Sequence, residues 1–367
     1  MTAGSRFPGA REGRILPLMV PTMTHPEDGA ELAEKVSFLA EPAAYGQATR
    51  RVEARETHMS WVFLTDDRVY KLKKPVRHAF LDFSTVSKRR FFCEEELRLN
   101  RRLAAATYRR VVPLCRDGSG GLTLGGEGRA VDWLVEMSRL PQADMLDERI
   151  RSGRVAVPEI ERIGGLLADF YAGLKLETAD GGAYLRHLVN EQRINREILL
   201  RPEFGLADIA SDELAKVDGL MQRAEPWIAA RLADGAIVEC HGDLRPEHVC
   251  LVQPPQIIDC LEFNRSMRIM DPYDEINYLG MECDMLGAAW IRPLVNRALD
   301  GRLPTRPIAP LMALYGGFRA LLRARLCIAH LLETPIRHAE KWRPLAIRYI
   351  RQAHKECSIL DSEQIGD

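Results

Sequence analysis

The chain has 367 residues, 46% of them hydrophobic, which is long enough for two lobes that each pack around a sizeable core. Its formal net charge of -1 argues against attraction of the whole protein to nucleic acid or to a membrane surface. No apolar run reaches the length of a membrane-spanning helix, and the eight cysteines include no CxxC pair, which together predict a protein of the reducing cytoplasm.

The first part of the chain is predicted to be an irregular segment followed by a β-rich lobe. Residues 1–27 mix Gly, Pro, Arg and Thr without periodicity and are expected to be mobile. The lobe should then cover residues 28–140, and it opens with an amphipathic helix at 31–39, where apolar residues recur at helical spacing. The remaining predicted elements of this lobe are strands at 51–55, 61–65, 68–72, 111–115 and 131–137, and one helix at 88–105.

The second part of the chain, residues 141–367, is predicted to be a mostly helical lobe, because apolar residues recur there at helical spacing. One region breaks this pattern. The β-rich runs 249–252 and 256–258 are separated by two prolines, which predicts a hairpin. Strands enclosing one helix, followed by a helical lobe, indicate an α+β fold with two lobes.

The predicted hairpin separates two short motifs that carry reactive side chains. The first is HGDLRPEH, residues 241–248, and the second is IIDC, residues 257–260. Phosphoryl transfer needs one carboxylate that deprotonates the attacking hydroxyl, and further ligands that hold metal ions on the phosphates of the nucleotide. Asp243, His248 and Asp259 have the spacing of such a set, and a hairpin would bring the two carboxylates together. The motifs therefore predict a phosphoryl-transfer site in a loop region, 241–262.

These two motifs resemble the catalytic and metal-binding loops of the aminoglycoside phosphotransferase-like kinases, whose pattern is HGDLxxxN followed by IDxx. The segments 56–64, 70–75 and 93–100 resemble one branch of that family, in which a P-loop ATPase domain often follows. No GxxxxGK[ST] motif occurs in residues 1–367, so the resemblance covers only the kinase-like part. It implies a bilobal, protein-kinase-like fold, ATP and Mg²⁺ as cofactors, and O-phosphotransferase activity on a hydroxyl-bearing acceptor that the sequence does not identify.

Two departures from the family pattern bear on activity. His248 stands where the family has a metal-binding Asn, and Asp259 is followed by Cys-Leu where protein kinases have Phe-Gly. Mg²⁺ prefers oxygen ligands and imidazole suits softer ions, so Mn²⁺ is an alternative to Mg²⁺. Two other functions stay open: a pseudokinase or ATP-binding regulatory module with little turnover, and a nucleotidyl transferase that transfers AMP.

Lysines on the third predicted strand are the candidates for binding the α- and β-phosphates. Alternation places Lys71 and Lys73 on one face of that strand. The resemblance favours Lys71, with Lys73 as the alternative, and two solvent lysines on an edge strand would be the non-functional explanation. In this fold a glutamate on the neighbouring helix holds the lysine, and Glu96 lies on the inward apolar stripe of helix 88–105.

The rest of the nucleotide is expected to contact a turn and a hinge. No GxGxxG loop is present, so the turn 56–60 would cover the phosphates through its N–H groups and the hydroxyls of Thr57 and Ser60. His58 in this turn is expected to be a surface or structural histidine rather than a ligand. Met137, at the end of the last strand of the first lobe, is expected to contact the adenine edge through its main chain.

The remaining charged residues have more than one explanation. Arg245 could neutralise charge on the transferred phosphoryl group, or form a salt bridge to Glu247 or Asp259. Asp271 and Asp274 are expected to be structural, with Asp271 capping a helix. Acidic residues at 275, 282 and 284 give a hint of an acidic acceptor pocket. Residues 50–110 contain 16 lysines and arginines against 8 acidic residues, which is typical of a solvated basic face and would also attract ATP or a separate protein partner.

Overall fold

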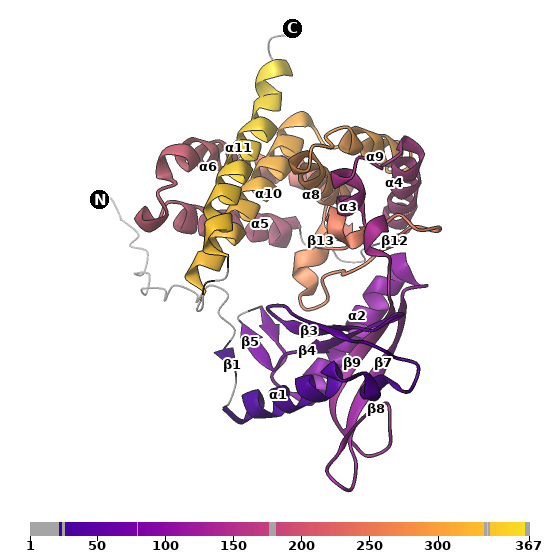
Figure 1. Ribbon diagram of the computed structural model, residues 1–367. Helices are drawn as coiled ribbons and strands as arrows, with labels where there is room; N and C mark the ends of the chain where they lie inside the picture. Colours follow the sequence, from indigo (N-terminus) through magenta and orange to yellow (C-terminus); the bar gives the residue numbers. More distant parts are fainter. Residues whose placement is uncertain are drawn as a thin grey trace, which may run out of the picture.

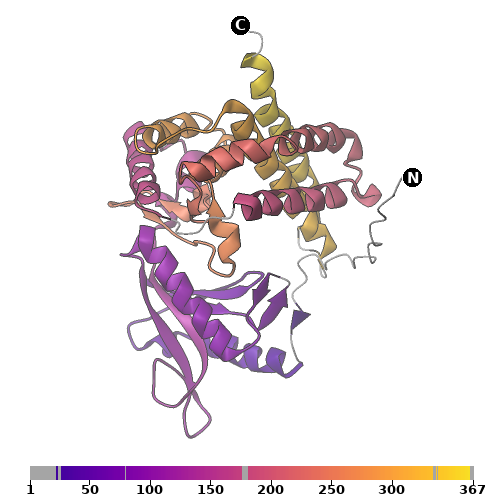
Figure 2. The ribbon, with the colours of Figure 1, turned by 180° about the vertical axis from the view of Figure 1, so that it is seen from behind.

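The structure is a computed structural model and describes residues 22–23, 26–78, 80–175, 181–333, 336 and 338–363. It has two lobes, a smaller one built on a β-sheet and a larger one of helices, joined at residues 139–141 (Figure 1 and Figure 2). This arrangement confirms the α+β, bilobal fold predicted from the sequence. Of the segment 1–27, for which mobility is expected, residues 1–21 and 24–25 lie outside the described residues.

A six-stranded antiparallel sheet forms the smaller lobe. In spatial order its strands are β2 (Glu53–Glu56), β3 (Ser60–Leu64), β4 (Arg68–Lys73), β9 (Arg129–Ser138), β7 (Tyr108–Arg116) and β8 (Leu122–Leu124). All five predicted strands occur in it, and the turn of Asp66 and Asp67 joins β3 to β4. Because β4 lies between β3 and β9, Lys71 and Lys73 are not on an edge strand, and the explanation that they are solvent lysines is wrong.

Two helices cover opposite faces of this sheet, α1 (Pro26–Ala40) and α2 (Val86–Ala104). Both were predicted, and both begin earlier than the apolar spacing indicates. Leu39 of α1 packs in a buried cluster with Leu72 on one face, and Cys93 of α2 belongs to a separate cluster on the other. In Figure 2 α2 runs along the near face of the sheet. The alternation along β4 therefore directs its two lysines towards α2.

A second, small sheet in this lobe was not predicted. Its strands, β1 (Thr22–Met23), β5 (Val76–His78) and β6 (Leu81–Asp82), have two or three residues each, too few to show a period. β1 lies within the segment 1–27 and pairs with β5. A short 3₁₀ helix, η1 (Pro42–Tyr45), connects α1 to the main sheet.

The larger lobe is mostly helical, as predicted. Its α-helices are α3 (Leu146–Arg151), α4 (Val157–Ala172), α5 (Gly181–Leu199), α6 (Ala207–Met221), α7 (Ala224–Ala233), α8 (Pro272–Met285), α9 (Ile291–Asp300), α10 (Ala309–Ala329) and α11 (Ala339–Glu363). Its 3₁₀ helices are η2 (Gln142–Asp144), η3 (Pro202–Phe204), η4 (Pro246–His248), η5 (Arg265–Arg268) and η6 (His330–Leu332). α10 and α11 pack along each other (Figure 1).

Two pairs of short strands interrupt these helices. The predicted hairpin is present as β11 (Val249–Cys250) and β12 (Gln256–Ile257), and it is shorter than expected. β10 (Val238–Glu239) pairs with β13 (Ile269–Met270), a two-residue strand that no pattern indicated. These two strand pairs fold the chain back on itself, so that the motif at 257–260 lies beside the motif at 241–248.

Helix α8 begins where it was predicted to begin. The side chain of Asp271 accepts the N–H of Tyr273 at 2.9 Å, which confirms that Asp271 caps the helix. Asp271 also pairs with Arg231 at 2.6 Å, and Asp274 pairs with Arg319 at 2.7 Å. Both aspartates are therefore structural, as expected.

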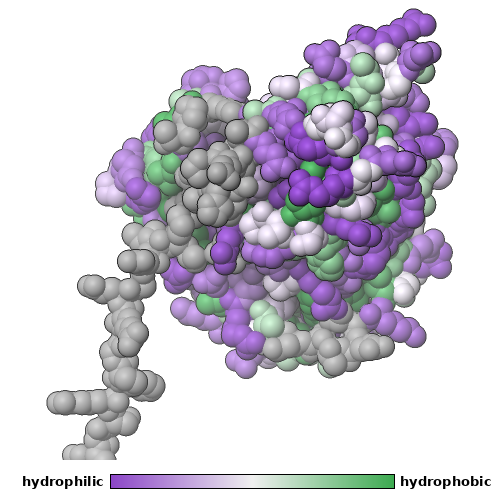
Figure 3. Space-filling model, turned by 90° about the horizontal axis from the view of Figure 1, so that it is seen from below, coloured by the Kyte–Doolittle hydropathy of each residue, from purple (hydrophilic) through white to green (hydrophobic). Residues whose placement is uncertain are grey.

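Among the described residues, no helix combines the length and the apolar character that crossing a membrane requires. Hydrophilic residues predominate on the face of the molecule drawn in Figure 3. All eight cysteines are buried, free thiols.

Candidate active site

The loop that carries Asp243 is fixed by a glycine and by a buried glutamate. Gly242 has a φ of +92°, which is strained for any residue with a side chain. A Cβ atom at this position would also lie 3.0 Å from Cγ of Arg268 and 3.1 Å from Cβ of Leu261, which is tighter than ordinary van der Waals contact. Glu275 of α8 accepts the N–H group of His241 at 3.0 Å and that of Gly242. The position of Asp243 therefore depends on both residues.

Glu275 is a supporting residue whose position was not expected from the sequence. It is 1% exposed and accepts the hydroxyl of Tyr171 at 2.6 Å, so it does not line an open acidic pocket. Burial raises its pKa and outweighs the hydrogen bonds that lower it. One feature of the sequence points to Glu275: it falls in the first turn of the helix that Asp271 is predicted to cap.

Asp243 is paired with Arg245. Nε of Arg245 lies 3.0 Å from Oδ1 of Asp243, and Nη2 donates to Oδ2 at 3.0 Å. Nη1 of Arg245 donates to Glu247 at 2.6 Å, so of the two expected salt-bridge partners the structure brings Glu247. Burial raises the pKa of Asp243, but Arg245, then His248 and Arg323, outweigh it and hold the pKa below its usual value. Asp243 is therefore ionised at neutral pH.

His248 stands between the two carboxylates of the site. Its Nδ1 donates to the main-chain oxygen of Asp243 at 2.7 Å, and its Nε2 lies 3.6 Å from Oδ2 of Asp259. When Nδ1–H of a neutral imidazole makes such a hydrogen bond, the lone pair is on Nε2. Metal-binding histidines are oriented in this way, by a hydrogen bond from the ring nitrogen that does not bind the metal. Arg245 also lies 3.3 Å from Nε2. The structure thus brings together the three residues predicted from the motif spacing.

Asp259 has an unusual backbone conformation. Its φ is +63°, and its N–H donates to the hydroxyl of Tyr108 at 3.1 Å. A non-glycine residue in this region costs of the order of 1–3 kcal/mol and is typical of functional sites. The side chain stays 45% exposed. The partial burial of this carboxyl raises its pKa, but Lys71 and His248 outweigh that effect, so the pKa of Asp259 lies far below its usual value.

Lys71 and Lys73 both reach Glu96, but only Lys71 also reaches Asp259. Nζ of Lys71 lies 3.0 Å from Glu96 and 2.8 Å from Asp259. Nζ of Lys73 lies 2.6 Å from Glu96 and also pairs with Glu262, and its side chain is fully buried. Burial lowers the pKa of both lysines, but the neighbouring carboxylates outweigh it, so both pKa values lie above the usual value. Lys71 is therefore placed for a ligand, and Lys73 for holding Glu96 and Glu262.

Two other predicted contacts are not open to a ligand. Ser60 is 2% exposed and its main chain is bonded to Thr57, whose hydroxyl donates to the oxygen of Ser60 at 2.9 Å. Met137 is opposite Val69 on one side and Tyr108 on the other, so its main chain belongs to the sheet. The expected adenine contact of the hinge that begins at Met137 stays a prediction, with Met137 itself paired on both sides within the sheet. The first residues beyond the sheet are 139–141.

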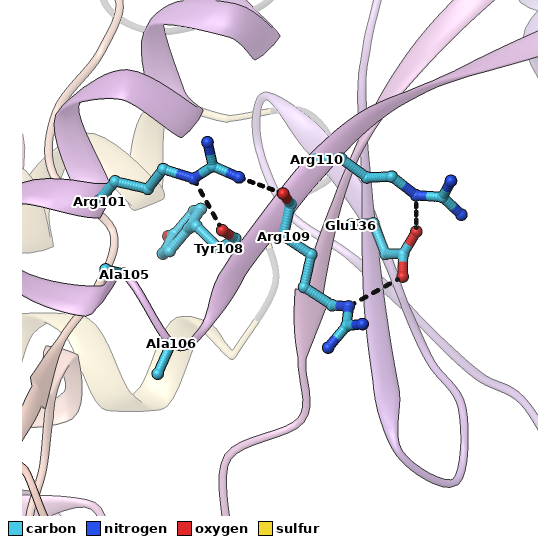
Figure 4. A pocket seen from close by; sticks show the side chains of 7 residues that line it. All are labelled: Arg101, Ala105, Ala106, Tyr108, Arg109, Arg110 and Glu136. Carbon is cyan, nitrogen blue, oxygen red and sulfur yellow. Dashed lines mark hydrogen bonds and ion pairs between the residues drawn. The ribbon is translucent and has the colours of Figure 1, made fainter.

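A hollow of about 450 Å³ lies beside the start of β7 (Figure 4). Arg109 and Arg110 point towards Glu136 in it, at 3.3 and 2.7 Å, so two arginines share one carboxylate. Asp243 and Asp259 do not line this hollow, whereas Tyr108, whose hydroxyl accepts the N–H group of Asp259, does. Its lining residues are Arg101, Ala105, Ala106, Tyr108, Arg109, Arg110 and Glu136.

His241 makes the stability of the site depend on pH. It is buried, its Nε2 donates to the oxygen of Ile258 at 2.9 Å, and its Nδ1 accepts the N–H of Asp243 at 3.3 Å. Burial and the nearby His248 lower its pKa to about 4. An unfolded histidine has a pKa of about 6.5, so the unfolded state binds more protons between these values.

We therefore expect the free energy of unfolding to decrease as the pH falls from about 6.5 to about 4, by the order of 3 kcal/mol from this residue. The measurement is denaturant unfolding across that range, on the wild type and on His241→Gln. The variant should be less stable at neutral pH and should lose less stability on acidification. Equal slopes for both proteins would show that His241 is not the group that titrates.

The family model described as the phosphotransferase enzyme family, APH, matches residues 64–308, a range that includes both lysines, Glu96, Asp243 and Asp259. The chain belongs to this family. The resemblance predicted from the two motifs is therefore confirmed.

Relatives of this family member extend the comparison without naming an acceptor. The chain is 29% identical over 308 residues to the uncharacterized protein Rv2004c of Mycobacterium tuberculosis, a match that covers 81% of this chain. The chain spans 59% of the length of that relative. An uncharacterized protein of Mycobacterium bovis, Mb2027c, matches to the same extent.

Two solved kinases share the fold of this family member. One is a choline/ethanolamine kinase family protein from Mesorhizobium loti, with a TM-score of 0.51 and 14% identity, covering 89% of this chain and 94% of that one. The other is a choline kinase from Cryptosporidium parvum, with a TM-score of 0.51 and 10% identity, covering 91% of this chain and 97% of that one. At such identities the likeness shows the fold alone.

Proposed function

We propose that this family member is an ATP-dependent O-phosphotransferase that acts on a small hydroxyl-bearing molecule. The observation that carries the proposal is the arrangement across the two lobes. Lys71 of β4 reaches Asp259 at 2.8 Å with Glu96 behind it, and His248 separates Asp259 from Asp243. These are the positions that a phosphate-binding lysine, a metal ligand and a catalytic base need in phosphoryl transfer.

The proposed reaction begins with the acceptor hydroxyl beside Asp243. Asp243 accepts the proton as the hydroxyl oxygen attacks the γ-phosphorus of ATP. The bond between that phosphorus and the β–γ bridging oxygen then breaks, and ADP leaves with the electron pair. Lys71 balances the negative charge of the α- and β-phosphates. Arg245, which already contacts Asp243, would donate to the transferred phosphoryl group as its charge redistributes.

The site also has the donors for a divalent ion. Asp259 offers an exposed carboxylate 3.6 Å from Nε2 of His248, so these two residues would hold the ion once Arg245, now 3.3 Å from Nε2, turns to the phosphoryl group. When bound, the ion would neutralise charge on the β- and γ-phosphates. A set that includes imidazole fits Mn²⁺ better than Mg²⁺, which prefers oxygen ligands.

His248→Asn is therefore expected to change the metal preference for nucleotide binding. In the wild type, Mn²⁺ should tighten ATP binding more than Mg²⁺ does, and the variant should prefer Mg²⁺ because an amide oxygen replaces the imidazole. Thermal-shift titrations with ATP, ADP and AMP-PNP in each metal measure this, because a ligand of the native state raises the melting temperature. His354→Asn, on α11, is the matched control. An unchanged preference in His248→Asn would remove His248 from the metal site.

The adenine is proposed to enter beside the hinge, beyond Met137. A hollow of about 310 Å³ lies there, between the hinge and the first two strands of the main sheet. Main-chain groups just beyond a strand end are a common means of reading a nucleobase edge, and apolar residues of the hollow would cover its faces. The lining residues are Arg55, Leu64, Asp66, Arg139, Leu140, Pro141 and Gln142.

The acceptor is proposed to be neutral or anionic rather than a polycationic amino sugar. Of the three acidic residues that hinted at a cationic acceptor, Glu275 is buried beneath the catalytic loop. Glu282 is bound by Arg323 at 2.6 Å, and Asp284 by Lys355 at 2.5 Å. Arg245 and Arg323 both lie close enough to Asp243 to lower its pKa, and these two positive charges would disfavour a cationic acceptor there.

An ATP-binding module with little turnover is the second candidate, and one observation favours it. Arg245 contacts both carboxylate oxygens of Asp243, which lowers the basicity of the proposed base. Both candidates predict metal-dependent ATP binding. Only the phosphotransferase predicts that ATP loses its γ-phosphoryl group in a reaction that depends on Asp243.

A further inference from the structure

Two histidines and one glutamate, contributed by different lobes, meet outside the proposed catalytic site. His58 lies in the turn between β2 and β3, whereas His330 and Glu333 follow α10 in the helical lobe. The rings of His58 and His330 stack with centroids 5.2 Å apart. Both rings face the same carboxylate oxygen, Oε1 of Glu333. Its distance is 2.8 Å from Nδ1 of His330 and 3.6 Å from Nε2 of His58. A contact between the lobes therefore depends on two imidazoles facing one carboxylate.

The spacing of these atoms fits a shared metal ion. One ligand atom from each residue lies within 4.8 Å of the other two. Ligands of a tetrahedral zinc ion, at about 2.0–2.2 Å from the metal, are roughly 3.3 Å apart, so the three atoms need to move little to share one. Two histidines and a glutamate also form a known three-ligand set that leaves a fourth position for water.

The surroundings allow an ion to enter and hold the ligands in place. The side chains are 47%, 27% and 17% exposed for His58, His330 and Glu333, so the cluster opens to solvent. His330 stacks on Trp342 of α11, with ring centroids 3.9 Å apart, which restricts the orientation of its ring. Restricting the rotation of a ligand lowers the entropy cost of binding an ion.

A histidine–carboxylate hydrogen bond by itself would not require an ion. Such a pair occurs elsewhere in the chain, where Nδ1 of His354 lies 2.8 Å from Glu213. There one imidazole faces the carboxylate, together with the ammonium group of Lys216 at 3.2 Å, which would repel a cation. At Glu333 the second group is another imidazole, which is a ligand for a divalent metal ion. The His354 pair is therefore a control built into the same molecule.

We propose that His58, His330 and Glu333 bind a divalent transition-metal ion of the zinc class, which ties the turn between β2 and β3 to the helical lobe. That turn lies within residues 56–60, the segment expected from the sequence to cover the phosphates of the nucleotide. Metal binding would hold the turn against the helical lobe and keep the two lobes closed. The metal site is independent of the proposed phosphotransferase activity and is tested without turnover.

The test is a titration of the metal-free protein with Co²⁺ alone, followed by ligand-field absorption, and with Zn²⁺ alone, followed by calorimetry. Asp259→Asn is used as the background, so that the proposed nucleotide–metal site does not contribute. One ion per chain is expected, with the strong visible bands of a low-coordinate Co²⁺ site. His58→Ala and His330→Ala should each weaken binding by at least roughly tenfold, since even residues that merely orient a ligand have effects of that size.

His354→Ala in the same background is the matched control and should bind the ion like its parent. Equal binding by all these proteins, or equal loss in His354→Ala, would overturn the site. Hydrogen exchange tests the consequence for the lobes. Zn²⁺ should slow exchange of the amides of residues 57–60 in the parent and leave them unchanged in His330→Ala. Unchanged exchange in the parent would show that the ion does not hold the turn.

Discussion

Asp243→Asn is expected to abolish phosphoryl transfer while leaving ATP affinity within a few-fold of the wild type. Removal of a general base costs roughly 10²–10⁴-fold in rate, because the attacking hydroxyl keeps its proton. ATP affinity should change little, because Asp243 faces Arg245 and His248 rather than Lys71. ADP release measures the rate, and calorimetry with a non-hydrolysable ATP analogue measures the affinity.

The matched control for this change is Asp169→Asn, an exposed aspartate on α4 that pairs with Arg302. It should turn over like the wild type. If Asp243→Asn released ADP as fast as this control, Asp243 would not be the base. If it lost ATP binding instead, the residue would hold the nucleotide rather than act on the acceptor.

Lys71→Ala is expected to weaken ATP binding or turnover by roughly 1–3 kcal/mol, the scale of a lost charge-assisted hydrogen bond. Glu96→Ala should add little to this loss, because residues that act as one unit are not additive. Adenosine binding should be unaffected by either change, since adenosine has no phosphates. Calorimetric titration of both nucleotides with the single and double variants measures these effects.

Lys73→Ala separates the two lysines. Lys73 is fully buried between Glu96 and Glu262, so its loss leaves two carboxylates without their partner and should chiefly lower the free energy of unfolding. Lys88→Ala, which removes an exposed lysine paired with Asp82, is the control and should change neither property. A larger loss of ATP affinity in Lys73→Ala than in Lys71→Ala would reverse the roles assigned to them.

Much of the fold was predictable because its signals are local. The alternation along strands and the two-residue turn at Asp66 and Asp67 predict β3 and β4 correctly. A proline pair between two β-rich runs predicts the hairpin of β11 and β12. β1, β6 and β13 have two residues each, and so short a strand carries no period. Their pairing is decided by tertiary contacts that no local pattern records.

The site was predictable in its residue types and less so in its contacts. Motif spacing correctly groups Asp243, His248 and Asp259, and alternation correctly places Lys71 and Lys73 on one face. Alternation does not say which lysine reaches Asp259, because that depends on Glu262, which lies 189 residues from Lys73 in the chain and pairs with it.

Two further contacts had no adequate sequence signal. Glu275 supports the loop that carries Asp243 through main-chain groups, which every residue has, so its partners cannot be read from side-chain types. His58 and His330 lie in different lobes, and only the packing of the lobes brings their rings together.

The most direct test of the proposed phosphotransferase is the Asp243-dependent loss of the γ-phosphoryl group from ATP. Calorimetry first establishes that the wild type and Asp243→Asn both bind ATP. Both proteins are then incubated with Mn²⁺, γ-labelled ATP and hydroxyl compounds. These compounds are pooled by charge into a cationic, a neutral and an anionic set. We expect the wild type to transfer the label to the neutral or anionic set at a rate at least roughly a hundredfold above the variant. Transfer to the cationic set alone would contradict the assignment of the acceptor, and equal loss of label from both proteins would contradict the catalytic role of Asp243. ATP binding by the wild type, without loss of label to any pool or to water, would contradict the phosphotransferase and leave the binding module.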